Sequence, residues 1–387
     1  MLTREHLQEA EDNYLAPYAM HSSKTRGRAH EIRPDRLRTE FQRDRDRVIH
    51  SMAFRKLEFK TQVHVITAGD YFRTRLTHTM EVAQIARTLA RSLRLNSDLA
   101  EAIALSHDFG HTPFGHAGED AMREAMREAG AGGFEHNEQG LRTVEILEER
   151  SAEHPGLNLT YEVREGIIKH DTAFDKPSCD ARYHPEERPT LESQLVDLAD
   201  EIAYNNADLD DALVMGLIEV KDLKAAPWVL EYFDEARREL GGEAPLKFVT
   251  YRALGRLYSD HVEDALTHSE GALRTNAISS IEDVRRFSGR LVDFSPEFKQ
   301  RLKPLKRLLL ERVYFHPGTL TNSLKARRML KALFEQYHEN PVLLPWKYQR
   351  RIETDGKARV VCDYIAGMTD RFFIEQYERI FLPDTHR

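Results

Sequence analysis

An all-α fold is predicted by three features of the sequence. Apolar residues recur at intervals of three and four along most of the chain, which is the spacing of one helix face. Candidate strands are few, and the best of them, QVHVI at 62–66, is short. The chain shows no internal repeat and no low-complexity tract. We expect a helical core at 50–220, a basic amino-terminal arm at 1–49, and a helical carboxy-terminal part at 221–387 packed on the core.

The expected helices follow in order. Between 74 and 95 the apolar residues fall on one face, at Val82, Ile85, Ala86, Leu89 and Leu93. A second helix is expected at 95–109, with Asn96 or Ser97 as its N-cap. Helical periodicity then recurs at 119–130, 137–152, 191–220, 223–240, 245–270, 296–313, 320–338 and 358–380. Glycine and proline place irregular segments at 110–118 and, with three prolines, at 171–190.

Composition indicates a globular protein of the soluble class. Of 387 residues, 41% are hydrophobic and 31% are charged, and the mean hydropathy is −0.59. No run of about 18 apolar residues exists and the start of the chain lacks a signal-peptide pattern, so we expect no membrane partner. The only two cysteines, Cys179 and Cys362, lie far apart and cannot form a disulfide framework. We therefore expect a cytoplasmic location.

The net charge of −8 hides a local basic excess. Residues 21–60 hold 12 Lys/Arg against 6 Asp/Glu, a local net charge of +6. One interpretation is a solvated arm. The other is a surface that meets phosphate, either in a nucleotide or in single-stranded nucleic acid.

Histidines concentrate in SHDFGHTPFGHAGE (106–119). His107 and Asp108 are adjacent near the end of an apolar helix, and Gly110 and Pro113 end that helix so that neighbouring side chains can converge. Imidazole and carboxylate together offer a mixed nitrogen and oxygen site for a divalent metal. Single histidines on apolar faces usually serve packing, but three in ten residues separated by glycines rarely do.

Two further ligands would complete such a site. His78 stands near the start of the preceding helix, and Asp200 lies on a later one, in LADEIAY. This ligand set leaves one or two positions open on a five- or six-coordinate metal, as a catalytic site needs for water or a phosphate oxygen. Mn or Mg is the expected metal, and the same donors also accept Fe, Co or Ni.

Six segments, in order, resemble one known family. H…HD…D is the signature of HD-domain metal-dependent phosphohydrolases, and the whole run is similar to the deoxyguanosine triphosphate triphosphohydrolase family, in its shorter bacterial triphosphohydrolase-like branch. The segments are RKLEFKTQV (55–63), RTRLTH (73–78), HDFGHTPFGHAGE (107–119), FEHNEQG (134–140), DLADEIAYNNADLDDA (197–212) and GMTDRF (367–372). The resemblance implies an HD-domain helical core with additional C-terminal helices.

The resemblance also implies a reaction and its residues. A dNTP triphosphohydrolase, a phosphoric monoester hydrolase, converts dGTP or several dNTPs and water into deoxynucleoside and intact triphosphate, with attack at the α-phosphorus. The implied metal ligands are His78, His107, Asp108 and Asp200. The implied catalytic residues are the pair His116 and Glu119, together with His111 at the α-phosphate and the active-site His136. The implied nucleoside pocket includes Gln62, Val63 and Tyr204, whose ring packs on the deoxyribose.

Helical spacing supports part of this assignment. His116 and Glu119 are three residues apart at a helix start, so the carboxylate can orient the imidazole. Asp200, Tyr204 and Asp208 share one helix face, which places Tyr204 and Asp208 on the substrate side. Arg75 lies one turn before His78, where a guanidinium suits a triphosphate oxygen. Either His111 or His136 could protonate the 5′-alkoxide that leaves.

Other functions and partners stay open. One alternative is an HD phosphohydrolase acting on nucleoside monophosphates or cyclic nucleotides. Another is a nucleotide- or ssDNA-binding regulator with weak turnover, using the basic residues 21–60. The basic amphipathic segments 303–317 and 323–337 are either solvated faces or an oligomer interface or effector site. By resemblance we expect a homo-oligomer, and a dNTP as allosteric activator is a further possibility.

Overall fold

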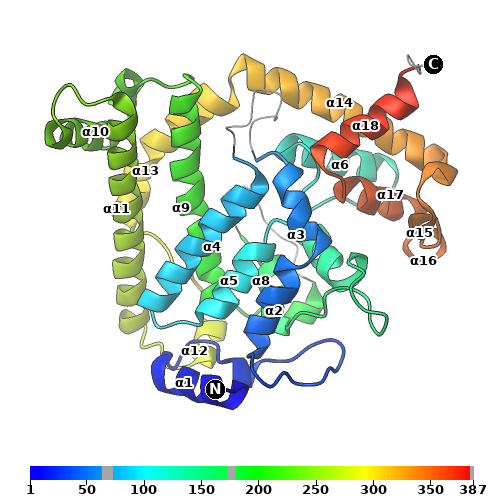
Figure 1. The fold of residues 1–387 in the computed structure, drawn as a ribbon, viewed down its shortest axis with the longest axis horizontal. Helices are drawn as coiled ribbons and strands as arrows, with labels where there is room; N and C mark the ends of the chain where they lie inside the picture. Colours follow the sequence, from blue (N-terminus) through cyan, green and yellow to red (C-terminus); the bar gives the residue numbers. More distant parts are fainter. Residues whose placement is uncertain (63–72, 172–179, 384–387) are drawn as a thin grey trace.

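The computed structural model describes residues 1–62, 73–171 and 180–383. Within these ranges the backbone is helical, with β-structure limited to three isolated bridges (Figure 1). The first half comprises α1 (Arg4–Tyr14), α2 (Glu40–Ile49), α3 (Met52–Lys56), α4 (Arg75–Ser92), α5 (Ser97–Ser106), α6 (Gly115–Glu128), α7 (His136–Arg142), α8 (Tyr161–Ile168) and α9 (Leu191–Val214). The second half comprises α10 (Pro227–Leu240), α11 (Leu246–Thr275), α12 (Ile281–Arg286), α13 (Pro296–Leu309), α14 (Pro317–Glu339), α15 (Trp346–Gln349), α16 (Ile352–Asp355), α17 (Lys357–Ala366) and α18 (Asp370–Phe381). The predicted all-α class is therefore confirmed.

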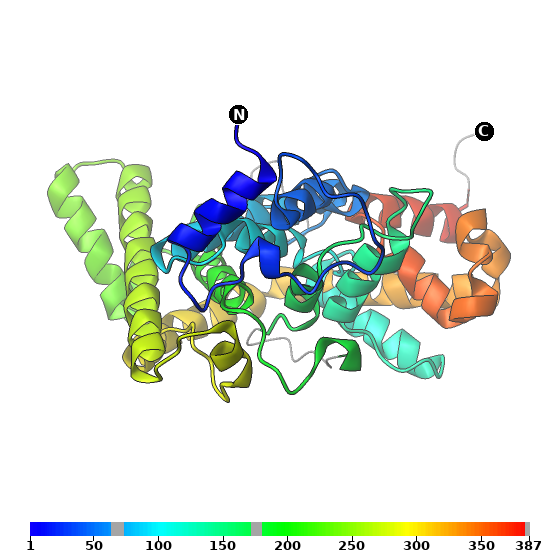
Figure 2. The ribbon, with the colours of Figure 1, turned by 90° about the horizontal axis from the view of Figure 1, so that it is seen from below.

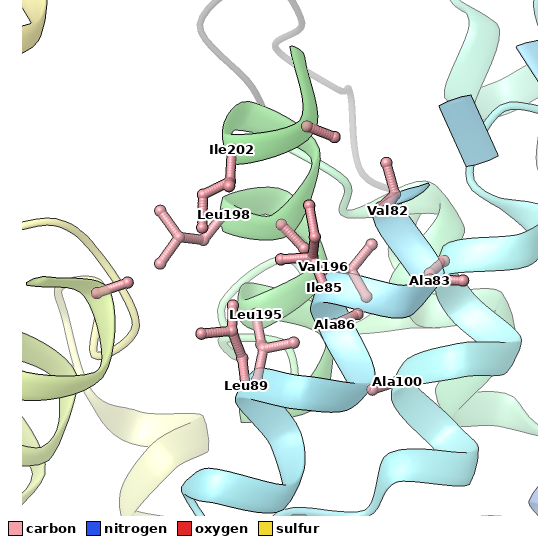
Figure 3. Close-up of a cluster of buried hydrophobic side chains, with 14 of the residues drawn as sticks. Val82, Ala83, Ile85, Ala86, Leu89, Ala100, Leu195, Val196, Leu198 and Ile202 are labelled. Atoms are coloured by element: carbon pink, nitrogen blue, oxygen red, sulfur yellow. The ribbon is translucent and has the colours of Figure 1, made fainter. Parts of the chain in front are cut away.

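Helices α4, α5 and α9 form the centre of the molecule. Each begins with a polar cap: Thr74, Asn96 and Thr190 accept hydrogen bonds from backbone N–H groups of the first turn. The apolar face predicted for 74–95 is buried against α9, where Leu89 packs near Leu195 (Figure 3). Complete burial of one such leucine stabilises the fold by about 1.5–3 kcal/mol. This packing fixes the three helices that carry or adjoin the predicted metal ligands.

Two hydrophobic clusters organise the described residues. The first joins α2, α4, α5, α8 and α9 to α10, α11 and α13. The second joins α6 to α14, α17 and α18. Seen from below, α10 and α11 stand at one end of the molecule and the last helices at the other, with α14 running between them (Figure 2). The first cluster crosses the expected borders at residues 49 and 220, and the second crosses the border at 220, so those domain limits stay predictions.

The basic amino-terminal segment is folded onto the core. The Arg28 side chain is only 6% exposed and pairs with Glu40, at 2.7 Å, and with the fully buried Asp44. Arg45 pairs with Asp98 of α5 at 2.8 Å. Arg28 and Arg45 thus pair with carboxylates of this protein, which favours a structural role for these two arginines.

Several helix limits differ from the prediction for identifiable reasons. The segment 110–118 was expected to be irregular throughout, but α6 begins at Gly115, after Phe114 adopts a left-handed conformation at φ 64°. The expected helix 137–152 ends at Leu147 with a π turn. The expected helix 358–380 is two helices, because Thr369 caps a new one. The strand candidate 62–66 lies almost wholly outside the described residues.

Helices that could cross a membrane are absent from the part of the chain that the structure describes.

Candidate active site

Three helices bring the first group of predicted metal ligands together. His78 lies in the first turn of α4, His107 follows α5, and Asp200 lies in α9. His78 Nε2 is 2.8 Å from Asp200 Oδ1, and His107 Nε2 is 3.9 Å from the same oxygen. The donor atoms of all three lie within 4.8 Å of one another. Both histidines are buried, so this cluster is a preorganised pocket of nitrogen and oxygen donors.

The state of His107 fits a metal ligand. Its Nδ1 donates a hydrogen bond to the Ala104 carbonyl at 2.6 Å, so Nε2 carries the lone pair. Nε2 is buried and has no hydrogen-bond partner among the described residues. Burial also lowers the pKa of His107, which keeps the ring neutral. A neutral imidazole aimed at carboxylates is the donor that divalent transition metals require.

Asp108 connects this cluster to a second one. Its Oδ1 lies 3.5 Å from His107 Nε2 and 2.8 Å from His111 Nε2. Its Oδ2 lies 3.0 Å from the buried Arg75 guanidinium. Burial alone would raise the pKa of Asp108, but its basic neighbours His107, Arg75 and His111 hold it well below its ordinary value. The carboxylate is therefore ionised, and it is oriented from both sides.

The second cluster consists of His111, Glu119 and His136, all buried. His111 Nδ1 hydrogen-bonds to Glu119 Oε1, and His136 Nδ1 lies 3.6 Å from Glu119 Oε2. The two imidazole rings stack with centroids 4.1 Å apart. Burial and Arg75 lower the pKa of His111, but Glu119 and Asp108 outweigh them and raise it to about 9. His111 therefore carries a proton at neutral pH.

His116 occupies a different position from its predicted partners. Its Nδ1 is 4.0 Å from Glu119 Oε2, and 58% of its side chain is exposed. The predicted spacing between His116 and Glu119 on one helix is present, yet Glu119 hydrogen-bonds to His111 instead. The exposed imidazole stands at the rim of the cluster, with its ring centroid 6.2 Å from that of His111.

Gly110 explains why these residues can meet. A Cβ atom at this position would lie 1.7 Å from the His136 carbonyl oxygen and 2.4 Å from the Gly140 nitrogen. Only glycine lets the start of α7 approach the turn this closely, and that approach brings His136 against His111. Gly110, which was expected only to end a helix, therefore also allows the close contact between this turn and α7.

The predicted substrate residues divide into three groups. Arg75 is buried on Asp108, beside the donor cluster. Tyr204 stacks on Tyr314 with ring centroids 6.1 Å apart, and the Tyr314 hydroxyl donates to Asp208. Burial raises the pKa of Asp208 to about 8, so this carboxyl is largely protonated at neutral pH. Gln62 has a buried side-chain oxygen, and Val63 lies outside the described residues.

Known proteins resemble this chain over nearly its whole length. A sequence model of the HD domain matches residues 75–205, and a model of the phosphohydrolase-associated domain matches residues 292–379. A deoxyguanosinetriphosphate triphosphohydrolase-like protein of Geobacter sulfurreducens is 48% identical over 99% of both chains. Proteins of the same description are 49% identical in Bordetella pertussis, over 95% of this chain and 97% of the relative, and 48% identical in Ralstonia pickettii, over 96% and 95%.

The chain belongs to the dGTPase-like family of HD-domain proteins. The family resemblance predicted from the sequence is thus confirmed. This dGTPase-like protein is an HD-domain phosphohydrolase whose His and Asp cluster is consistent with a divalent metal. The phosphohydrolase-associated match covers the C-terminal helices, beginning just before α13.

Sequence reasoning missed His170, which follows α8. Its Nδ1 is 2.6 Å from Asp197 Oδ1 and its Nε2 is 3.6 Å from Asp200 Oδ2. Burial lowers the pKa of His170, but Asp197 outweighs burial and raises it well above its ordinary value. The imidazolium thus links two carboxylates and orients Asp200. A signal existed, because IIKHD repeats the pattern of an apolar helix followed by His-Asp.

Replacing His170 by alanine should weaken Mn²⁺ binding by about 10- to 100-fold, the usual effect of losing a group that orients a metal ligand. Calorimetric titration of the purified protein measures this directly. His184→Ala is the control, since His184 is exposed and pairs with Glu186 instead. Equal Mn²⁺ affinity in the wild type and the His170 variant would contradict this role.

Proposed function

We propose that this HD phosphohydrolase hydrolyses deoxynucleoside triphosphates to deoxynucleoside and triphosphate with a divalent metal. The observation that carries the proposal is the 2.8 Å link between Asp108 and His111. It joins a set of metal-ligand donors to a buried imidazole–carboxylate cluster, so a phosphate held by the first cluster lies against proton donors of the second. The relatives, described as deoxyguanosinetriphosphate triphosphohydrolase-like, support this substrate class.

Each cluster then has its own task. The metal would be held by His78, His107, Asp108 and Asp200. Mn²⁺ or Mg²⁺ is the expected ion for this set of donors. When bound, that metal polarises the α-phosphate and offsets the charge that builds in the transition state. Arg75 keeps Asp108 in its ligand orientation and adds positive charge toward the triphosphate.

The second cluster would move the protons. Glu119 holds both His111 and His136, and the imidazolium at His111 has a proton to give to the departing O5′ atom. His116, partly exposed at the rim, is placed to orient the attacking water. Tyr204 and the protonated Asp208 would pack on and hydrogen-bond to the deoxyribose.

A substrate panel tests the proposal. Purified protein with Mn²⁺ or Mg²⁺ is incubated with each dNTP, alone and with a second dNTP as activator, and the products are separated by anion exchange. We expect triphosphate and deoxynucleoside in equal amounts. Orthophosphate or pyrophosphate as the first product would overturn the reaction assignment, and faster turnover in mixtures would indicate an effector site.

A further inference from the structure

The GMTDRF segment lies against the turn that carries His111. We call residues 111–115 the catalytic turn, because they connect His111 to α6, the helix of His116 and Glu119. Asp370, 256 residues farther along the chain, accepts a hydrogen bond from the Phe114 backbone N–H through Oδ1 at 3.1 Å. Its Oδ2 accepts from the Thr61 N–H at 3.0 Å and from the Thr61 hydroxyl. One buried carboxylate thus ties the turn to Thr61.

The turn needs such a hold because its backbone is strained. Phe114 has φ 64° and ψ 24°, a left-handed conformation that non-glycine residues rarely adopt. Phe114 is also the N-cap of α6, and its side chain cannot accept a hydrogen bond there. Asp370 accepts instead from the N–H of this N-cap residue, which is the contact that an N3 side chain makes in a capping box, and it lies at the positive end of the α6 dipole.

Two further contacts connect the same regions. The buried Lys60 ammonium donates to the His111 carbonyl at 2.5 Å and to the Ala366 carbonyl at 2.9 Å. The Phe114 ring packs edge-on against Phe373, with ring centroids 5.1 Å apart. The start of the turn is therefore fixed through Lys60 and its end through Asp370, both against the junction of α17 and α18.

We propose that Asp370 is a positioning residue for hydrolysis at the candidate active site. It acts through the Phe114 N–H and Thr61, and it holds the catalytic turn so that His111 and Glu119 keep their common geometry. The inference rests on the proposed function, which gives that geometry its task. Through Asp370, helix α18 would therefore contribute to catalysis by positioning the catalytic turn, a role that the metal ligands and the imidazole cluster do not fill.

The test compares Asp370→Asn with Gln376→Leu in the full-length protein. Asparagine keeps the shape of aspartate but turns one oxygen into an amino group, which then faces an N–H donor. Gln376 is a matched control, because it is also buried in α18 but contacts Tyr337 within the C-terminal part. The readouts are kcat and KM for a dNTP, Mn²⁺ affinity, and hydrogen–deuterium exchange in a peptide spanning 111–118.

For Asp370→Asn we expect kcat to fall about 100-fold, as small misplacements of catalytic groups do, while KM and Mn²⁺ affinity change less than about threefold. Exchange in 111–118 should become faster. Gln376→Leu should leave both kcat and the hydrogen–deuterium exchange of residues 111–118 as in the wild type. The proposal is overturned if exchange in Asp370→Asn equals that of the wild type, or if both variants lose kcat equally. If the wild-type protein were inactive on every dNTP, the proposed function would be wrong. The exchange rates of residues 111–118 would still show whether Asp370 holds the turn.

Discussion

Replacing His107 by alanine should abolish measurable Mn²⁺ binding and lower kcat by at least about 1000-fold, which corresponds to about 4 kcal/mol of transition-state stabilisation. The reason is that His107 Nε2 is the one buried imidazole nitrogen of the donor cluster without a hydrogen-bond partner among the described residues. Removing it takes away the neutral nitrogen donor that lies 3.5 Å from Asp108 Oδ1 and 3.9 Å from Asp200 Oδ1. Asp108→Ala should have the same effect, since it removes a ligand that Arg75 and His111 hold in place.

The control for this experiment is His261→Ala. His261 is as buried as His107 and likewise hydrogen-bonds through Nδ1 to a carbonyl of its own helix, that of Leu257 at 2.6 Å. Its ring packs on Phe294 and Phe298. This variant should lose stability but retain Mn²⁺ affinity and kcat. If His107→Ala bound Mn²⁺ as tightly as His261→Ala, the assigned ligand set would be wrong.

Glu119→Gln should lower kcat by about 100- to 1000-fold and leave Mn²⁺ affinity unchanged. Glutamine has nearly the same shape, but it is neutral, so it cannot keep His111 protonated or hold two imidazoles through two anionic oxygens. Steady-state kinetics with a dNTP, together with calorimetric Mn²⁺ titration, separate the two effects. Loss of Mn²⁺ binding in this variant would show that the second cluster is part of the metal site.

His116→Ala provides a graded comparison. The ring is largely exposed and 4.0 Å from Glu119, so its removal should also leave Mn²⁺ binding intact while reducing kcat. If His116→Ala lost the metal as well, its assignment as a water-orienting group would be wrong.

Local sequence patterns predicted the parts of the structure that depend on short segments. The apolar spacing of 74–95 and the cap residue Asn96 predicted α4 and α5, because each depends on neighbours within one or two helical turns. The adjacent His107 and Asp108 indicated a metal site for the same reason. Asp200 was expected as a carboxylate ligand on a later helix, which the family signature also implies, and packing of α9 against α4 brings it to His78.

Contacts between distant segments could not be predicted in this way. Spacing along α6 paired Glu119 with His116, whereas tertiary packing around Gly110 brings Glu119 to His111 and His136. Asp370 reaches Phe114 because Phe373 of α18 packs on the Phe114 ring in the second hydrophobic cluster. Such pairings depend on the whole fold, which single-segment patterns do not encode.

The basic residues near the amino terminus illustrate a related limit. Composition gave residues 21–60 a net charge of +6 and left a phosphate-bearing partner open. The structure pairs Arg28 with Asp44, and Arg45 with Asp98, a carboxylate outside the counted segment. A charge count over one segment cannot include partners that folding brings from elsewhere.

Hydrolysis in ¹⁸O-labelled water tests the central claim most directly, with ³¹P NMR of the products as the readout. Attack of water on the α-phosphorus breaks its bond to O5′, so the account predicts one ¹⁸O atom on a terminal phosphorus of intact triphosphate and unlabelled deoxynucleoside. Label in the deoxynucleoside would place the attack on carbon. Label in orthophosphate or in a nucleoside phosphate would place the cleavage at another phosphorus or another bond, and either result would contradict the account.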